Sequence, residues 1–143
     1  MIRFLLIVFA LVYGTETGED GSGTLLIVRL TGFSSMRGAA RVALFDSGEF
    51  WPEDIDNAVR RISASVGADT VFMTIKDLDP GEYAISAFHD EDLDSIFDRG
   101  LFGVPTEDYG FSNNVRGSTG PPPFEDALFT VGQDTLVLDI VLE

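Results

Sequence analysis

The sequence predicts an all-β protein, an antiparallel β-sandwich of about seven strands with one short helix and a long irregular loop. Three observations support this prediction. Short apolar segments alternate with polar residues at a period of two, which is typical of half-buried strands. Glycines and prolines, 15 and 6 in number, separate these segments. The 143 residues suffice for one domain, and 45% of them are hydrophobic.

The first residues have the pattern of a secretory signal. Arg3 precedes an apolar run over residues 4–12, which is too short to span a bilayer. We therefore expect residues 1–14 to be a cleaved signal peptide. A buried first strand or an uncleaved anchor is the alternative. Residues 15–23 are acidic and glycine-rich, which predicts a flexible leader ahead of a domain at 24–143.

Most elements of the first two thirds are predicted as strands. Alternation of apolar and polar residues predicts strands over 24–31, 39–46, 70–76 and 83–88. The first two could form a hairpin through a turn at 32–38. Residues 47–61 combine apolar residues at helical spacing with acids ahead and arginines behind, which predicts one or two turns of helix. Pro80 and Gly81 predict a type II turn, with a positive φ at the glycine.

Two more strands are predicted near the end of the chain. Three consecutive prolines at 121–123 cannot donate to a sheet and predict an extended connection. A short strand is expected over 124–131, and the clearest alternation in the chain predicts a last strand over 136–143. Residues 88–120 remain as an irregular stretch, and such long stretches usually carry function or are disordered.

Charge and composition exclude several classes of function. The net charge of −15 repels phosphate backbones and anionic membranes, so nucleic acid is excluded as a partner. The absence of cysteine excludes disulfides, thiol catalysis and thiolate metal sites. With no membrane span expected after removal of the signal, we predict an exported protein, periplasmic or extracellular.

A calcium loop is predicted at the start of the irregular stretch. Positions 1, 3, 5 and 9 of such a loop are occupied by Asp90, Asp92, Asp94 and Asp98, and position 7 is Ile96, whose carbonyl could also bind. Calcium requires six to eight hard oxygen ligands, which alternate carboxylates can supply. The alternative is a solvated acidic loop held by turn hydrogen bonds.

Two positions depart from the calcium-loop pattern. Ser95 stands where a sharp loop prefers glycine, and Leu101 supplies no carboxylate at position 12. Glu107 or Asp108 could supply the missing carboxylate from further along the chain. The tightness of the loop and its full ligand set therefore depend on the tertiary structure.

His89 is the single histidine of the chain. It could in principle polarise Ser86 or Ser112, as in a hydrolase, but no nucleophile-elbow motif accompanies it. A histidine that hydrogen-bonds a carboxylate for structural reasons is the favoured interpretation. Acidic pairs suited to glycoside hydrolysis are expected by chance in so acidic a chain, so no catalytic residue is assigned.

Residues 109–117, YGFSNNVRG, predict a loop that braces itself. Asn113 and Asn114 tolerate left-handed backbone and carry amides, and Arg116 could clamp a carboxylate such as Glu125. The alternative is a polar pocket ringed by three aromatic residues, Tyr109, Phe111 and Phe124.

Four segments resemble a known family: VALFDSGEFW, DLDPGEYAISAFHDED, LFGVPTEDYGFSNNVRG and PPPFEDALFTV. Together they resemble the bacterial domain-of-unknown-function family 2141, over Leu25–Leu142. The resemblance implies an exported, periplasmic or surface β-sandwich, similar to transthyretin-like and carboxypeptidase-regulatory-like domains, without an established activity. The family pattern has asparagine and glycine in the acidic loop, where this chain has DLDS at 92–95. Oxygen ligands are kept and the flexible glycine is lost.

Three functional hypotheses follow from the sequence. The first is an exported non-enzymatic domain whose loop at 88–120 is organised by calcium and which binds a protein or a glycan. The second is a metal-free accessory or interaction domain with the same loop braced by its asparagines and arginine. A hydrolase is the third.

Overall fold

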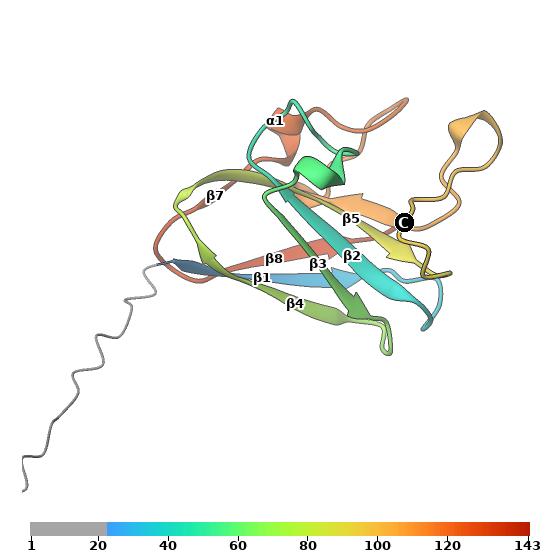
Figure 1. Cartoon of the computed structure of the whole chain (residues 1–143), viewed down its shortest axis with the longest axis horizontal. Coiled ribbons are helices and arrows are strands. Elements are labelled where there is room, and N and C mark those ends of the chain that lie inside the picture. The colour runs from blue at the N-terminus through green and yellow to red at the C-terminus, as the bar shows by residue number, and fades with distance from the viewer. Residues whose placement is uncertain (1–22) are drawn as a thin grey trace, which may run out of the picture.

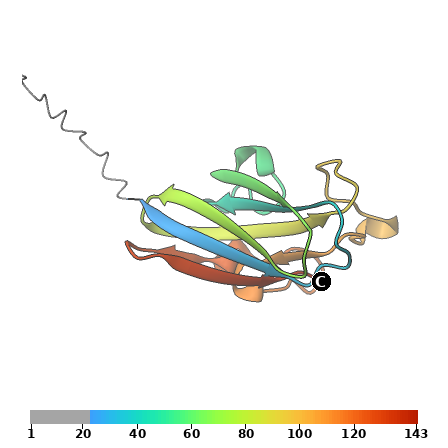
Figure 2. The ribbon, with the colours of Figure 1, turned by 90° about the horizontal axis from the view of Figure 1, so that it is seen from below.

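A computed structural model describes residues 23–143, which form eight strands in two sheets packed face to face (Figures 1 and 2). This confirms the predicted all-β sandwich. The predicted signal peptide at 1–14 and nearly all of the predicted leader at 15–23 lie outside the described residues. No helix within 23–143 has the length and apolar character needed to cross a membrane.

The smaller sheet has three strands in the order β4-β1-β8. Its members are β1 (Thr24–Thr31), β4 (Val71–Leu78) and β8 (Leu136–Val141). β1 pairs with β4 in the antiparallel direction and with β8 in the parallel direction. The parallel pair departs from the all-antiparallel expectation, because the last strand enters the sheet beside the first after crossing the other layer.

The larger sheet has five strands, four of them in the order β3-β2-β5-β6. These are β2 (Ala39–Phe45), β3 (Arg60–Ser65), β5 (Gly81–Asp90) and β6 (Tyr109–Phe111). β7 (Phe129–Val131) pairs with the first residues of β5, and β6 pairs with residues near its end. The long strand β5 thus lies at the centre of this sheet and ends beside β6.

The core lies between the two sheets, as the alternation in the sequence predicts. Inward-facing residues of both sheets are fully or almost fully buried, among them Leu26, Val28, Leu30, Val42, Leu44, Ile85 and Ile140. Burying each such side chain contributes about 1.5–3 kcal/mol, so this layer carries most of the stability. The last residues of β5 lie at one end of it.

Several local predictions are wrong. The first two strands do not form a hairpin, because β1 and β2 belong to different sheets. The predicted helix over 47–61 is reduced to one 3-10 turn, Ile55–Asn57, and β3 begins three residues later, at Arg60. β3 is a polar edge strand in which only Ile62 and Ala64 are partly buried, so its alternation is weak.

Two further local predictions are wrong. The expected strand over 124–131 is shortened to β7, because the first residues form the single turn of α1 (Phe124–Ala127), with acids at its N-terminus. Gly81 does not adopt the predicted positive φ. Asp77 has φ 56°, but it lies within β4, where the pairing with β1 is irregular, and the chain crosses between the sheets at residues 79–80.

A second apolar layer covers the outer face of the larger sheet. Trp51 lies at its centre, with ring centroids 5.4–5.8 Å from those of Phe45, Phe111 and Phe124. Its indole N–H donates to the carbonyl of Pro122 at 2.8 Å. The loop between β5 and β6 continues this layer and extends beyond one end of the sandwich (Figure 1).

Candidate functional site

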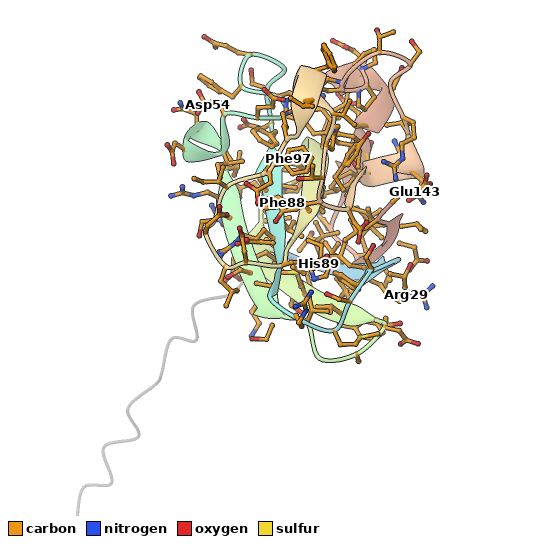
Figure 3. The ribbon with its side chains drawn as sticks, turned by 90° about the vertical axis from the view of Figure 1, so that its right-hand side faces the viewer. Arg29, Asp54, Phe88, His89, Phe97 and Glu143 are labelled. Atoms are coloured by element: carbon orange, nitrogen blue, oxygen red, sulfur yellow. The ribbon has the colours of Figure 1, made fainter. Side chains whose placement is uncertain are left out.

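The candidate site lies where β5 ends and the loop at 91–108 begins. Successive residues of a strand point to opposite faces, so His89 faces the core and Asp90 faces the outer layer. Both side chains are completely buried. Phe88, next to them on β5, packs on Phe97 of the loop at 5.4 Å between ring centroids (Figure 3). The end of one strand therefore presents titratable groups to two separate environments.

On the outer face, carboxylates gather in two overlapping groups. Asp90, Asp92 and Glu107 each bring one oxygen within 4.8 Å of the others, and Asp92, Asp94 and Asp98 do the same. Asp92 belongs to both groups. The predicted aspartates are thus neighbours, but all four are not brought into a single such group. Glu107 is one of the two substitutes suggested for position 12. It joins the group of Asp90 and Asp92.

Short hydrogen-bonded turns shape this acidic loop. Asp94 Oδ1 accepts the Ile96 N–H at 2.8 Å, and Asp90 Oδ2 accepts the Ser95 N–H at 3.0 Å. Glu107 Oε2 accepts the N–H of Asp98 at 3.0 Å, which ties the two ends of the loop together. The structure records Ile96 as a donor, and the proposed role of its carbonyl stays a prediction.

The loop keeps a tight path without glycine. Leu93 and Ser95 have φ values of 59° and 65°, in the left-handed region that glycine adopts without cost. Ser95 is the position where the calcium-loop pattern has glycine. The substitution therefore leaves the local geometry in place and adds backbone strain, which the surrounding hydrogen bonds must offset.

Asp90 is held by an arginine on the neighbouring strand. Arg41 Nε donates to Asp90 Oδ2 at 2.6 Å, and the arginine side chain is 26% exposed. The other carboxylate oxygen, Oδ1, is buried and has no hydrogen-bond partner. A buried carboxylate oxygen without a partner is costly, so this atom is a natural ligand for a cation.

The carboxylates of the outer face differ in their pKa values. Burial alone would raise the pKa of Asp90, but the hydrogen bonds from Arg41 and Ser95 outweigh it and lower the pKa. Burial raises the pKa of Glu107, and the charge of Asp98 adds to the effect. Desolvation and the neighbouring carboxylates of Asp90, Asp94 and Asp98 raise the pKa of Asp92. The group thus concentrates negative charge that one arginine does not neutralise.

On the inner face, His89 is positioned by the segment that joins β1 and β2. Its Nε2 lies 2.6 Å from the carbonyl of Arg37, and its ring packs edge-on against Phe33 at 5.1 Å. Its Nδ1 has no hydrogen-bond partner and lies 3.6 Å from Asp108 Oδ2 and 4.0 Å from Glu91 Oε1. The sequence favoured a histidine bonded to a carboxylate; the structure brings two carboxylates near but outside hydrogen-bond length.

The histidine and serine residues considered for hydrolysis are not paired. Ser86 donates to the carbonyl of Pro52, and Ser112 donates to the carbonyl of Ala127 at 2.5 Å. Neither serine is among the recorded partners of His89 in the described part of the chain. Ser86 and Ser112 are therefore not paired with His89 as a nucleophile and its base would be.

The polar residues of 109–117 contact neighbouring segments. Asn113 Nδ2 donates to the carbonyls of Asp126 and Leu128, at 3.1 and 2.8 Å. Asn114 bonds to β8 in both directions, donating to Asp139 O and accepting from the Val141 N–H. Both asparagines have positive φ, 59° and 51°. This segment thus joins β8 to the segment at 126–128.

Arg116 lies beside a carboxylate, but a different one from the example that the sequence suggested. Arg116 lies 3.5 Å from a carboxylate oxygen of Glu143, not from Glu125, and its guanidinium lies 4.8 Å from the ring centre of Tyr109. The C-terminal residue reaches it because Tyr109 and Glu143 exchange backbone hydrogen bonds at 3.1 Å. This contact depends on the pairing of residue 143 with the start of β6, which periodicity does not reveal.

A cavity of about 620 Å³ lies beside the loop on the outer face. Its apolar lining includes Phe88, Phe97, Phe102, Tyr109 and Phe111. The predicted ring of three aromatic residues is thus correct for Tyr109 and Phe111. Phe124 is not part of the lining and packs on Trp51 instead. The pocket is also more apolar than predicted, because neighbouring loop aromatics complete it.

Sequence reasoning missed Arg41, Glu91 and the pairing of Asp108 with His89. No periodicity indicates this pairing, because Glu91 and Asp108 lie just outside β5 and β6, where the alternation of a strand no longer holds. Arg41 carried no signal beyond its position on a predicted strand.

A family model matches most of the sequence. The sequence model described as "Uncharacterized protein conserved in bacteria (DUF2141)" matches residues 28–138, which is more than half of the chain. Comparison with curated proteins and with solved structures found no match.

Proposed function

The chain belongs to the DUF2141 family of bacterial proteins, and from this premise we propose that it is an exported, non-enzymatic, calcium-binding β-sandwich. Calcium would bind to the acidic groups on the outer face and organise the loop at 91–108. The periplasm or the cell surface is the proposed location. Calcium is abundant outside the cell, so such a site would be filled there and its loop held in one conformation.

The buried oxygen Oδ1 of Asp90 carries this proposal. It has no partner, and its carboxylate belongs to the group that includes Asp92 and Glu107. Calcium prefers six to eight hard oxygens at 2.3–2.6 Å, and carboxylates are its commonest protein ligands. Asp94 and Asp98 form a second group with Asp92, and we propose that calcium draws the two groups together. Arg41 neutralises one carboxylate, so the negative charge of the other carboxylates remains for the ion.

Calcium is expected to raise the melting temperature of the protein relative to chelator. An ion that binds only the folded state stabilises it by about 2.7 kcal/mol when its free concentration is about 100 times Kd. For a domain of this size, the shift is on the order of 10 °C. Scanning calorimetry with calcium, with magnesium at equal ionic strength, and with chelator measures it. The absence of a calcium-specific shift would favour the metal-free accessory domain.

An Asp92→Asn variant makes this test sharper, because its two expected effects have opposite signs. Removing one of several crowded carboxylates should raise the melting temperature in chelator, since it relieves repulsion. The same change should abolish or reduce the calcium-induced shift. Asp134→Asn, on an exposed turn outside these groups, is the matched control and should behave as wild type. A calcium shift retained in full by Asp92→Asn would contradict the site.

The loop itself favours a protein as the binding partner. Its tip carries three exposed large apolar side chains, Leu101, Phe102 and Val104, with Phe102 completely exposed. Exposed apolar patches on soluble domains mark interaction sites, and polar glycans gain less from aliphatic side chains. The adjacent cavity, lined by aromatics, would receive an apolar segment of the partner.

Phe102→Ser should abolish partner binding without changing stability. The side chain is fully exposed, so its loss should change the free energy of unfolding by less than about 0.5 kcal/mol. The Phe102→Ser and Phe72→Ser variants are compared in two assays. The first is cross-linking to proteins of the host cell envelope, and the second is binding to a glycan array. Phe72 is 64% exposed on the other sheet, so its loss controls for non-specific binding by an exposed phenylalanine. Equal loss in both variants, or glycan binding that is lost with Phe102, would contradict a protein partner at this loop.

A further inference from the structure

His89, Glu91 and Asp108 form a second group of possible ligands, separate from the acidic groups on the outer face. One ligand atom of each lies within 4.8 Å of the other two. His89 points to the opposite side of β5 from Asp90, and Glu91 and Asp108, which lie just after β5 and just before β6, gather around it. No residue is shared between the two groups.

The tautomer of His89 directs a lone pair into this group. Nε2 lies 2.6 Å from the Arg37 carbonyl, which only accepts, so Nε2 carries a proton. In the neutral ring Nδ1 then bears the lone pair. That atom is completely buried and has no hydrogen-bond partner. A buried lone pair beside two carboxylates is unfavourable unless positive charge lies between them.

The distances match a shared metal ion better than a direct ion pair. Nδ1 lies 3.6 Å from Asp108 Oδ2 and 4.0 Å from Glu91 Oε1, which exceeds the N···O length of a hydrogen bond. Zinc binds histidine nitrogen at about 2.0–2.1 Å and carboxylate oxygen at about 2.0–2.2 Å. In tetrahedral coordination two such ligand atoms lie about 3.4 Å apart. The Asp108 separation is close to this value, and the partly exposed Glu91 side chain reaches it by a small movement.

Each of the three residues is oriented by a second contact from one segment, residues 33–38. Arg37 accepts from His89 through its carbonyl and donates from Nη2 to Glu91 Oε2 at 3.2 Å. The Ser34 N–H donates to Asp108 Oδ2 at 2.8 Å. Metal-bound histidines and carboxylates typically have such outer partners. The Glu91 side chain is 32% exposed, which provides a route of entry from solvent.

We propose that His89 Nδ1, Glu91 and Asp108 bind a divalent transition-metal ion, with Zn²⁺ as the representative ion. Imidazole with two carboxylates suits zinc and its neighbours in the first row, whereas calcium prefers oxygen alone. The protein would then carry two cation sites of different chemistry on the two faces of β5. This site does not depend on the calcium proposal, because none of its ligands belongs to the outer groups.

Calorimetric titration of zinc in excess calcium, using the protein with a tag that lacks histidine, tests the proposal. We expect one zinc ion per chain. Glu91→Gln and His89→Gln should each weaken zinc binding by at least about 10-fold, because loss of outer-shell partners alone costs 10- to 100-fold. Glutamine at 89 can still donate to the Arg37 carbonyl. If the His89→Gln variant does not fold, the Glu91→Gln variant still tests the site, because Glu91 is partly exposed.

The matched control and an independent readout complete the test. Glu82→Gln, at the exposed start of the same strand, should bind zinc as wild type does, and Glu91→Gln should keep its calcium response. Because His89 is the single histidine, nitrogen NMR of imidazole reports on it alone, and zinc should shift Nδ1 while Nε2 stays protonated. Equal zinc binding by all variants would overturn the site. So would a ring protonated on both nitrogens and unaffected by zinc, which would indicate a buried imidazolium.

Discussion

Asp90→Ala is expected to lower the free energy of unfolding by about 2–3 kcal/mol in the presence of chelator. The change removes the partner of Arg41 and the acceptor of the Ser95 N–H, and it leaves the guanidinium on a largely covered surface. Breaking a buried ion pair on one side typically costs 3–5 kcal/mol, and the partial exposure of Arg41 places this case at or below the lower end. Urea unfolding measures the loss without any contribution from calcium.

Asp139→Ala is the control for this prediction. It breaks the other aspartate–arginine pair between neighbouring strands, Arg29 with Asp139 at 2.5 Å, in which both side chains are about half exposed. Water screens such a pair, so its loss should cost less than about 1 kcal/mol. If the two variants lost equal stability, Asp90 would not be the buried anchor of the acidic loop.

Gly38→Ala is expected to cost more than about 2 kcal/mol and to weaken both proposed cation sites. Gly38 has φ +72°, where an L-residue is strained, and an added Cβ would lie 2.1 Å from the Asp90 carbonyl oxygen and 2.6 Å from Glu91 Cα. Both atoms are backbone, so relief requires the end of β5 to move. Chemical unfolding, followed by calcium and zinc titrations of the folded variant, measures the two effects.

Gly67→Ala separates this effect from the general consequence of removing a glycine. Gly67 has no atom within 4 Å of its added Cβ and no positive φ. Its substitution should leave stability unchanged or raise it by up to about 1 kcal/mol, because alanine restricts the unfolded chain. If Gly38→Ala were as stable as Gly67→Ala and kept both ions, the close packing of this glycine against β5 would have no functional role.

The sequence alone was sufficient for the all-β class, for most strands and for the position of the acidic loop. Strands such as β1, β4 and β8 bury one face against a continuous core, so their apolar residues must recur at every second position. The four aspartates at 90–98 have the spacing of a calcium loop, and the sequence offers Glu107 and Asp108 equally for its missing carboxylate. These are local properties, which neighbouring residues encode directly.

Only the tertiary structure decided which strands pair and which residues meet. β1 and β2 are adjacent in sequence but lie in different sheets, and β1 pairs with β8 from the other end of the chain. Likewise, Arg116 meets Glu143, and His89 meets Asp108. Such pairs depend on the sum of packing across the whole core, which no window of the sequence contains. The acidic loop can therefore be predicted from the sequence. The ion pair of Arg41 with Asp90, and the group of His89, Glu91 and Asp108, form only in the folded chain.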